Sequence, residues 1–209
     1  KHRYRCIVSG ACTPAVTSNA GVLSVSNAVA ISNQPADVTI CSGNSTSFTI
    51  AATGSIVSYQ WQLSTDGGGS FNNITSANAA TLSLNNVSSS LTNYSYRCII
   101  TGGCNSVTST AATLTVQVPP SINTQPVSVN ICSGTSNTFS VNASGDGLTY
   151  QWQISTDGGT SWTNVNGAVN NQLTVSNVTT AQNNNRYRCV VSGACTPAVT
   201  SNAALLNVT

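Results

Sequence analysis

The residues of this chain best suited to chemistry are its eight cysteines. Three fall in each of two long stretches, at positions 41, 98 and 104 and again at positions 132, 189 and 195, and two more stand near the start as Cys6 and Cys12. A structural zinc site needs cysteine or histidine pairs at short spacing. Because five residues separate Cys98 from Cys104, that pair is too widely spaced for a usual zinc knuckle, and we expect disulfides or buried thiols instead.

Catalytic chemistry has almost no candidate residues. His2 is the only histidine, glutamate is absent, and the four aspartates are far apart in sequence. General acid and base pairs and nucleophilic triads require such groups close together. The sequence therefore predicts that the chain is not an enzyme and has no catalytic residue, no cofactor and no metal. Among metals, calcium bound at exposed aspartate turns is the least unfavourable.

The charge composition narrows the classes of partner. Charged residues form 5% of the chain, six basic against four acidic. This density is too low to hold a phosphate backbone, so we expect no nucleic-acid partner. No apolar run approaches the roughly 18 residues of a membrane helix, so we expect no membrane insertion. Eight cysteines in so uncharged a chain favour an oxidising, extracellular setting.

An internal repeat organises the chain. Trp61 and Cys98 recur as Trp152 and Cys189, each 91 positions later. Residues 27–117 and 118–209 are therefore predicted to be two complete domains. Residues 1–26 match only the last quarter of a copy, and residues 3–20 differ from residues 186–203 at one position. We interpret residues 1–26 as the C-terminal strand pair of a preceding domain, in an array where two repeat types alternate.

Apolar and polar residues alternate with period two inside each copy, which is the pattern of half-buried strands. Turn residues such as Gly54-Ser55 and Gly102-Gly103 separate these runs. About seven short strands in about 90 residues favour two packed antiparallel sheets. The predicted fold class is all-β, with tandem β-sandwich domains. Residues 155–162 also fit the Asp-box pattern Ser-x-Asp-x-Gly-x-x-Trp, which we interpret as a structural hairpin.

Two signals in each copy resemble the immunoglobulin fold. Trp61 on the third strand and Tyr96 two residues before Cys98 resemble its core tryptophan and tyrosine corner. The position of the usual partner cysteine holds Ile50, and Val141 in the next copy, so the usual inter-sheet disulfide is not expected. The predicted buried core includes Cys6, Cys98, Cys189, Trp61, Trp152, Tyr96 and Tyr187.

The motif set resembles one family in particular. Ile-Cys-Ser-Gly, Tyr-Gln-Trp-Gln-x-Ser-Thr-Asp-Gly-Gly and Tyr-Arg-Cys occur together in the first copy. The combination is similar to the immunoglobulin-like repeats of giant secreted surface proteins of the Bacteroidota, which include gliding adhesins exported by the type IX secretion system. This resemblance implies an extracellular location on a bacterial cell surface and a role as an adhesin, stalk or filament.

The positions of the cysteines predict how they pair. In a sandwich of this topology, the first turn and the last hairpin tip lie at opposite poles, so Cys41 and Cys104 are too far apart to bond. Poles of successive domains meet in a head-to-tail array. We therefore favour an inter-domain disulfide from Cys41 to Cys195, with Cys104 reaching back to an upstream domain and Cys132 forward to a downstream one.

Other pairings stay open. Cys12 is a further disulfide candidate. A hairpin bond from Cys98 to Cys104 would leave Cys41 free or bound to another chain. An intradomain bond from Cys41 to Cys98, or fully reduced cysteines, are the remaining alternatives.

The functional hypothesis is a structural or adhesive segment of a long extracellular array, whose partners are neighbouring domains of the same array or filament. The alternatives are a module that binds surface glycans or proteins through its variable loops, and an accessory region of a secreted enzyme. The aromatic residues lie mainly at core positions, so no platform for stacking sugars is evident.

Overall fold

The structure is a computed structural model and describes residues 1–209. It confirms the all-β prediction: apart from strands it contains only two single-turn 3-10 helices, η1 (Ser89–Leu91) and η2 (Thr180–Gln182). The strands before and within the first repeat are β1 (His2–Tyr4), β2 (Ile7–Val8), β3 (Val16–Thr17), β4 (Gly21–Leu23), β5 (Ala30–Asn33), β6 (Val38–Cys41), β7 (Thr46–Thr49), β8 (Ala51–Thr53), β9 (Ile56–Ser64), β10 (Asn72–Asn73), β11 (Thr81–Leu84), β12 (Tyr94–Gly102), β13 (Ser106–Thr108) and β14 (Ala112–Gln117). Those of the second repeat are β15 (Ser121–Thr124), β16 (Val129–Ile131), β17 (Asn137–Ser140), β18 (Asn142–Ser144), β19 (Thr149–Ser155), β20 (Thr163–Asn164), β21 (Gln172–Val175), β22 (Asn185–Ser192), β23 (Val199–Thr200) and β24 (Ala204–Val208).

The chain divides into two compact units whose boundaries do not coincide with the repeats. The first unit comprises residues 1–38, 47–83 and 94–113. The second comprises residues 39–46, 84–93 and 114–209. The second unit therefore contains the complete second repeat, together with the turn after β6, the segment around η1 and the end of β14 from the first repeat.

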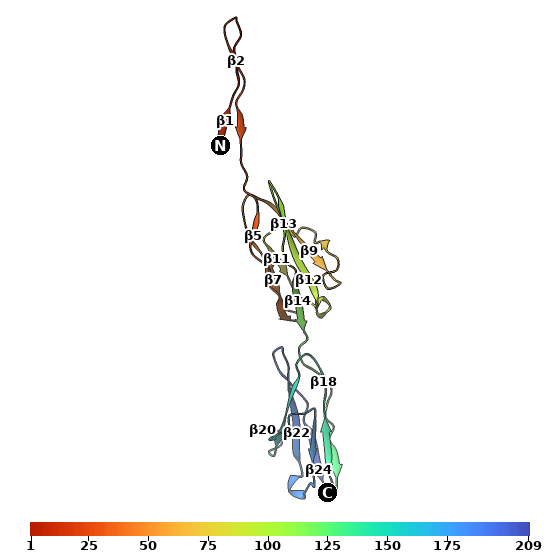
Figure 1. Cartoon of the computed structure of the whole chain (residues 1–209). Helices are drawn as coiled ribbons and strands as arrows, with labels where there is room; N and C mark the ends of the chain where they lie inside the picture. The colour runs from red at the N-terminus through yellow and green to blue at the C-terminus, as the bar shows by residue number, and fades with distance from the viewer. The chain divides into compact units, whose positions relative to one another are not determined.

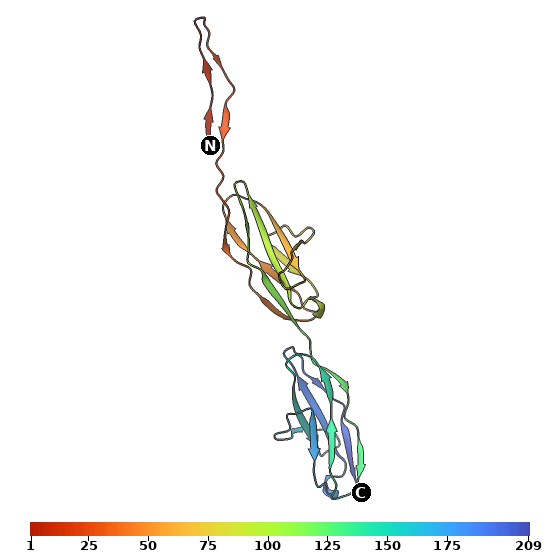
Figure 2. The same cartoon turned by 45° about the vertical axis from the view of Figure 1, so that its right-hand side comes forward.

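The second repeat is a sandwich of two sheets. The larger sheet has the order β16-β24-β22-β19-β20, and β23 extends the pairing of β22. Strand β16 runs parallel to β24, whereas β22 is antiparallel to both β24 and β19. The facing layer is made of the pairs β15-β18 and β17-β21 (Figures 1 and 2). Short antiparallel strands joined by tight turns bury one face each, as the period-two pattern requires.

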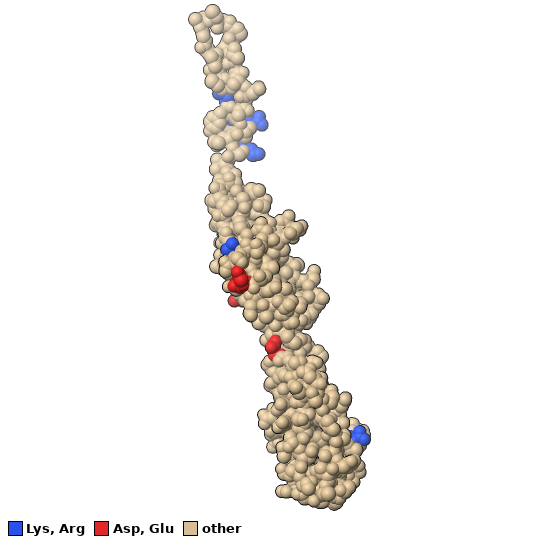
Figure 3. Space-filling model, turned by 90° about the vertical axis from the view of Figure 1, so that its right-hand side faces the viewer, with Lys and Arg blue, Asp and Glu red and all other residues tan.

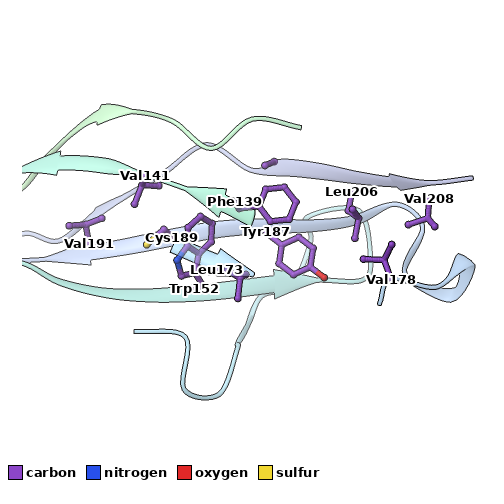
Figure 4. Close-up of a cluster of buried hydrophobic side chains, with 11 residues drawn as sticks. Phe139, Val141, Trp152, Leu173, Val178, Tyr187, Cys189, Val191, Leu206 and Val208 are labelled. Carbon is purple, nitrogen blue, oxygen red and sulfur yellow. The ribbon is translucent and has the colours of Figure 1, made fainter. Parts of the chain in front are cut away.

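The core of the second repeat lies between these sheets. Figure 4 shows side chains from both layers pointing into it. Trp152 and Cys189 face each other across β19 and β22, and both are fully buried. The Tyr187 ring stacks on Phe139, with centroids 5.0 Å apart. The indole nitrogen of Trp152 donates a hydrogen bond to the Asn170 carbonyl at 3.0 Å, so burial of this ring leaves no polar atom without a partner.

The first repeat has the same strand order in its larger sheet, β10-β9-β12-β14-β6. Trp61 and Cys98 are opposite each other on β9 and β12 and are also fully buried. Ile50 and Val141 are buried aliphatic residues at the positions where a partner cysteine would stand. The sandwich is therefore held by packing and hydrogen bonds at these positions rather than by a bond between the sheets.

Residues 1–26 form a hairpin in which no side chain is buried. Strands β1 and β4 pair, as do β2 and β3, but no second sheet covers them (Figures 1 and 2). Val8 is 65% exposed, whereas Val191 at the matching position of the second repeat is 0% exposed. The prediction that Cys6 is a core residue is wrong for this structure, because Cys6 is exposed where the facing sheet is missing.

Candidate functional site at the cysteine-bearing junction

The candidate site is a disulfide inside the second unit. Cys41 and Cys195 are bonded, with 5.9 Å between their Cα atoms and 154 positions between them in sequence. The Cα separation lies in the range that a disulfide needs without backbone movement. Cys195 is buried and Cys41 half-buried, so the bond is largely shielded from solvent thiols. It links a residue of the first repeat covalently to a residue of the second.

Backbone hydrogen bonds fix Cys41 at the end of β6. The turn that follows is held where the Ser42 amide donates to the Gln117 carbonyl at 2.8 Å and the Gly43 amide donates to the Val87 carbonyl at 2.8 Å. Gly43 adopts a positive φ of 89°, which glycine tolerates at this turn. The first turn of the first repeat is thus tied to Gln117, where β14 ends and the linker of residues 118–120 begins.

Asp146 positions the linker on the hairpin that carries Cys195. Its carboxylate accepts a hydrogen bond from the Val118 amide at 2.7 Å, and its own amide donates to the Val118 carbonyl at 3.0 Å. The Asp146 carbonyl accepts from the Ala194 amide at 2.8 Å. The Cys195 sulfur lies 3.7 Å from the Gln117 carbonyl oxygen. One aspartate therefore connects the linker to the loop next to the disulfide.

Close packing at a glycine completes this arrangement. Gly145 has φ of 138°, and a Cβ there would lie 2.8 Å from the Pro119 carbonyl oxygen and 2.9 Å from the Pro120 Cα. In the first unit, Gly54 occupies the matching position, where a Cβ would clash with the Ala28 carbonyl oxygen. In each repeat, the segment that precedes the first strand therefore packs against a position where only glycine fits.

Each of two other cysteines has the same surroundings as one partner of this disulfide. In the first unit, the Cys104 thiol donates to the Ser26 carbonyl at 3.3 Å, as the Cys195 sulfur meets Gln117 in the second. In the second unit, Cys132 precedes a turn in which the Ser133 amide donates to the Thr209 carbonyl at 2.9 Å, as Ser42 does after Cys41. Both thiols are free and exposed, and so is that of Cys12.

Two further cysteines are packed in the cores. Cys98 and Cys189 are free and buried, and the structure contains neither a bond from Cys98 to Cys104 nor one from Cys41 to Cys98. Burial raises the pKa of the Cys98 thiol and raises the pKa of Cys189 to about 11. A thiol with a raised pKa and no access to solvent is a poor nucleophile, so these two act as small apolar core residues.

The Asp-box hairpins are rigid turns. The Asp157 carboxylate accepts hydrogen bonds from the hydroxyl of Ser155, from the amide of Thr160 and from both the amide and the hydroxyl of Ser161. The hydrogen bonds from Ser161 and Ser155 hold the pKa of Asp157 far below its usual range. Asp66 is bound in the same way in the first repeat. These carboxylates are fully occupied in shaping the loops.

One arrangement was not predicted from the sequence. Arg97 and Arg188 each lie over an aromatic ring, with the guanidinium carbon 3.9 Å from the centre of the Phe71 ring and 4.2 Å from that of Trp162. The signal was present, because arginine occupies this repeat position in both copies of a chain with only six basic residues. The partners of these arginines are set by cross-strand register, which sequence spacing did not reveal.

Other kinds of site are not seen. No group of three or more histidine, cysteine or acidic side chains is placed to hold a metal ion. No helix is long and apolar enough to cross a membrane.

Comparison with known proteins identifies the repeats. The profile of the family described as "Domain of unknown function (DUF8696)" matches residues 30–118 and residues 122–209. No curated protein matches the chain in sequence.

Solved structures share its fold. Extracellular domains 3–5 of Drosophila OTK match with a TM-score of 0.59 at 20% identity, over 99% of this chain and 70% of that one. An I-band fragment from titin matches with a TM-score of 0.66 at 17% identity, over 89% of this chain and 66% of the fragment. The complex of Dpr11 IG1 with DIP-gamma matches with a TM-score of 0.58 at 16% identity, over 87% of this chain and 98% of that one. At these identities the similarity shows the fold, which is a tandem of immunoglobulin-like domains.

Proposed function

The chain belongs to the family described as a domain of unknown function, DUF8696, and from that premise we propose that it is a structural and adhesive segment of a long extracellular array on a bacterial cell surface, as in an adhesin stalk or a filament shaft. The proposed role is mechanical and non-enzymatic. Tandem immunoglobulin-like domains suit it because each domain buries its own core and adds length.

The observation that carries the proposal is the bond from Cys41 to Cys195. It joins the two repeats covalently, beside a linker that already makes hydrogen bonds to Asp146. A linker that makes no further contacts lets the two domains that it joins move independently. A second covalent connection opposes that movement and carries load when the chain is pulled. We call this bond the staple.

The free cysteines support extension of the staple along an array. Cys104 has the environment of Cys195, and Cys132 has the environment of Cys41. In the proposed array, Cys104 bonds to an upstream domain and Cys132 to a downstream one. Cys12 belongs to the preceding domain and forms there the bond that Cys195 forms in the second repeat. Residues 1–26 are then the C-terminal strand pair of that domain, since their exposed side chains match buried ones in residues 184–209.

The proposed setting follows from the same bond. A disulfide persists in an oxidising compartment, which favours an extracellular location. The sparse charges also suit a surface protein whose solubility rests on serine, threonine and asparagine; Figure 3 shows how few charged side chains one face presents.

Two measurements test the proposal. Peptide mapping without reductant, on protein prepared under oxidising conditions, is expected to yield a fragment that joins Cys41 to Cys195, and the Cys41→Ser variant is the control that loses it. Antibodies raised against residues 118–209 are expected to label intact cells of the source organism. Absence of the linked fragment contradicts the staple, and labelling only after cells are broken open contradicts the surface location.

A further inference from the structure

Each repeat carries a row of polar side chains across three neighbouring strands. In the first unit, Asn73, Gln62 and Arg97 are directly opposite one another on β10, β9 and β12. The Gln62 amide donates to the Asn73 side-chain oxygen at 2.8 Å, and Arg97 Nε donates to the Gln62 side-chain oxygen at 2.8 Å. The guanidinium carbon of Arg97 then lies 3.9 Å from the centre of the Phe71 ring. We call this row the arginine ladder.

The second unit repeats the arginine ladder with the same connectivity. Asn164, Gln153 and Arg188 are opposite one another on β20, β19 and β22. The two hydrogen bonds measure 3.0 and 2.8 Å, and the guanidinium lies over Trp162. Two copies of one side-chain geometry show that the guanidinium is held in a defined orientation, by a hydrogen bond on one edge and an aromatic ring on one face.

The outer edge of each guanidinium has no partner in the chain. Arginine has five N–H donors, and only the Nε donor is engaged here. The four carboxylates that could pair with it are bound elsewhere. Asp37 accepts from the Thr113 amide and Asp146 from the Val118 amide, and Asp66 and Asp157 are occupied within their own loops. Arg97 and Arg188 are half-buried, so their free N–H groups still face solvent.

We propose that the arginine ladders are binding sites for the carboxylates of an acidic polysaccharide. A fixed guanidinium edge matches a carboxylate with two parallel hydrogen bonds. The exposed amide of Asn73, or of Asn164, lies on the same row and can bond to sugar hydroxyls. The rings serve to hold the arginines and are covered by them, so the site recognises charge and hydroxyls rather than stacking on sugar faces.

Because one exposed ion pair is weak, a polymeric ligand is favoured. A single arginine and carboxylate pair at a surface contributes little affinity. A polyuronate carries carboxylates on successive sugars, so a molecule held at one ladder keeps further carboxylates near it, and ladders repeated along an array gain from this linkage. Repeated sites of this kind turn a weak contact into adhesion along an array. This inference goes beyond the structural role, because the ladders contain no residue of the staple.

The test compares binding of the full chain to three polymers by isothermal titration calorimetry at low ionic strength. Polygalacturonate is expected to bind, with affinity that falls as salt is added, whereas neutral dextran is expected not to bind. Loss of one exposed contact of this kind weakens binding by up to about fivefold. The double variant Arg97→Gln/Arg188→Gln removes the arginine of both ladders and is therefore expected to lose measurable binding of polygalacturonate.

A matched control removes the same charge elsewhere. The double variant Arg3→Gln/Arg186→Gln also deletes two positive charges, at exposed residues outside the ladders, and is expected to retain most of the affinity. Circular dichroism shows whether each variant is folded, and Arg97→Lys/Arg188→Lys provides a second test that keeps the charge but removes the planar edge. Equal losses in the two glutamine variants, or no binding by wild type, overturn the proposal. Equal binding of poly-L-glutamate overturns the assignment to a polysaccharide. Loss of the Cys41 bond should leave polygalacturonate binding unchanged, so the staple can fail without affecting this result.

Discussion

Pulling the chain from its two ends gives the sharpest test of the staple. The disulfide excludes the 154 positions between Cys41 and Cys195 from the extensible length of the unfolded chain. A fully extended residue spans about 3.3 to 3.6 Å, so the hidden segment corresponds to about 530 Å. Reduction of the bond is therefore expected to lengthen the fully unfolded molecule by that amount.

Single-molecule force spectroscopy measures this difference directly. Molecules stretched without reductant should show the short final length, and the same preparation with dithiothreitol should show the long one. The Cys41→Ser variant should show the long length in both conditions, whereas Cys104→Ser should behave as wild type because Cys104 is not bonded.

The same assay separates the staple from the other pairings. A bond from Cys41 to Cys98 would hide a segment of about 200 Å, and a bond from Cys98 to Cys104 only about 20 Å. A gain on reduction near either value, or no gain at all, would refute the connectivity on which the mechanical role depends.

Three further predictions concern the fold that supports the junction. Gly145→Ala should lower the free energy of unfolding more than Gly134→Ala does, because both glycines have a positive φ but only at Gly145 does the added Cβ also meet the linker backbone. The backbone strain should cost about 1–3 kcal/mol at each position, with the packing conflict added at Gly145. Urea denaturation would compare the two, and equal losses would contradict the packing argument. Trp152→Ala should cost about 3–5 kcal/mol by emptying the centre of the core, and a loss under about 1 kcal/mol in the same assay would argue against that packing. The raised pKa of Cys189 gives stability that is complete below the unfolded value of about 8.5 and is lost as the pH rises toward about 11; denaturation curves across this range should therefore fall more steeply for wild type than for Cys189→Ala, and parallel curves would show that the thiol does not titrate with unfolding.

Much of the fold could be read from local patterns. The 91-residue period and the period-two alternation can be read from the order of residues along the chain, and most strands of the second repeat follow them. The core positions of Trp61 and Trp152 also followed, because a tryptophan in the middle of an alternating run is buried when that face is covered. Cys6 shows where this reasoning fails. Its local sequence matches that of Cys189, yet it is exposed, because burial depends on a facing sheet that residues 1–26 do not contain.

The cysteines show how far positional reasoning extends. Placing Cys41 in the first turn and Cys195 near the last hairpin tip was enough to favour a bond between repeats over bonds within them, since a disulfide requires close Cα atoms. The groups that hold those residues could not be foreseen. In the sequence, Asp146 resembles any other loop residue. Only the folded backbone brings its carboxylate to the Val118 amide.

The sequence by itself therefore determined the repeat, the all-β class, the lack of evident catalytic groups and a short list of cysteine pairings, because these depend on composition and on the order of residues along the chain. The tertiary structure decided which cysteines have matching surroundings and how the linker packs against Gly145. It also decided that the guanidinium groups of Arg97 and Arg188 keep N–H donors without a partner. Each of these depends on strand register and on contacts between residues 28 to 78 positions apart, and no local pattern encodes such distances.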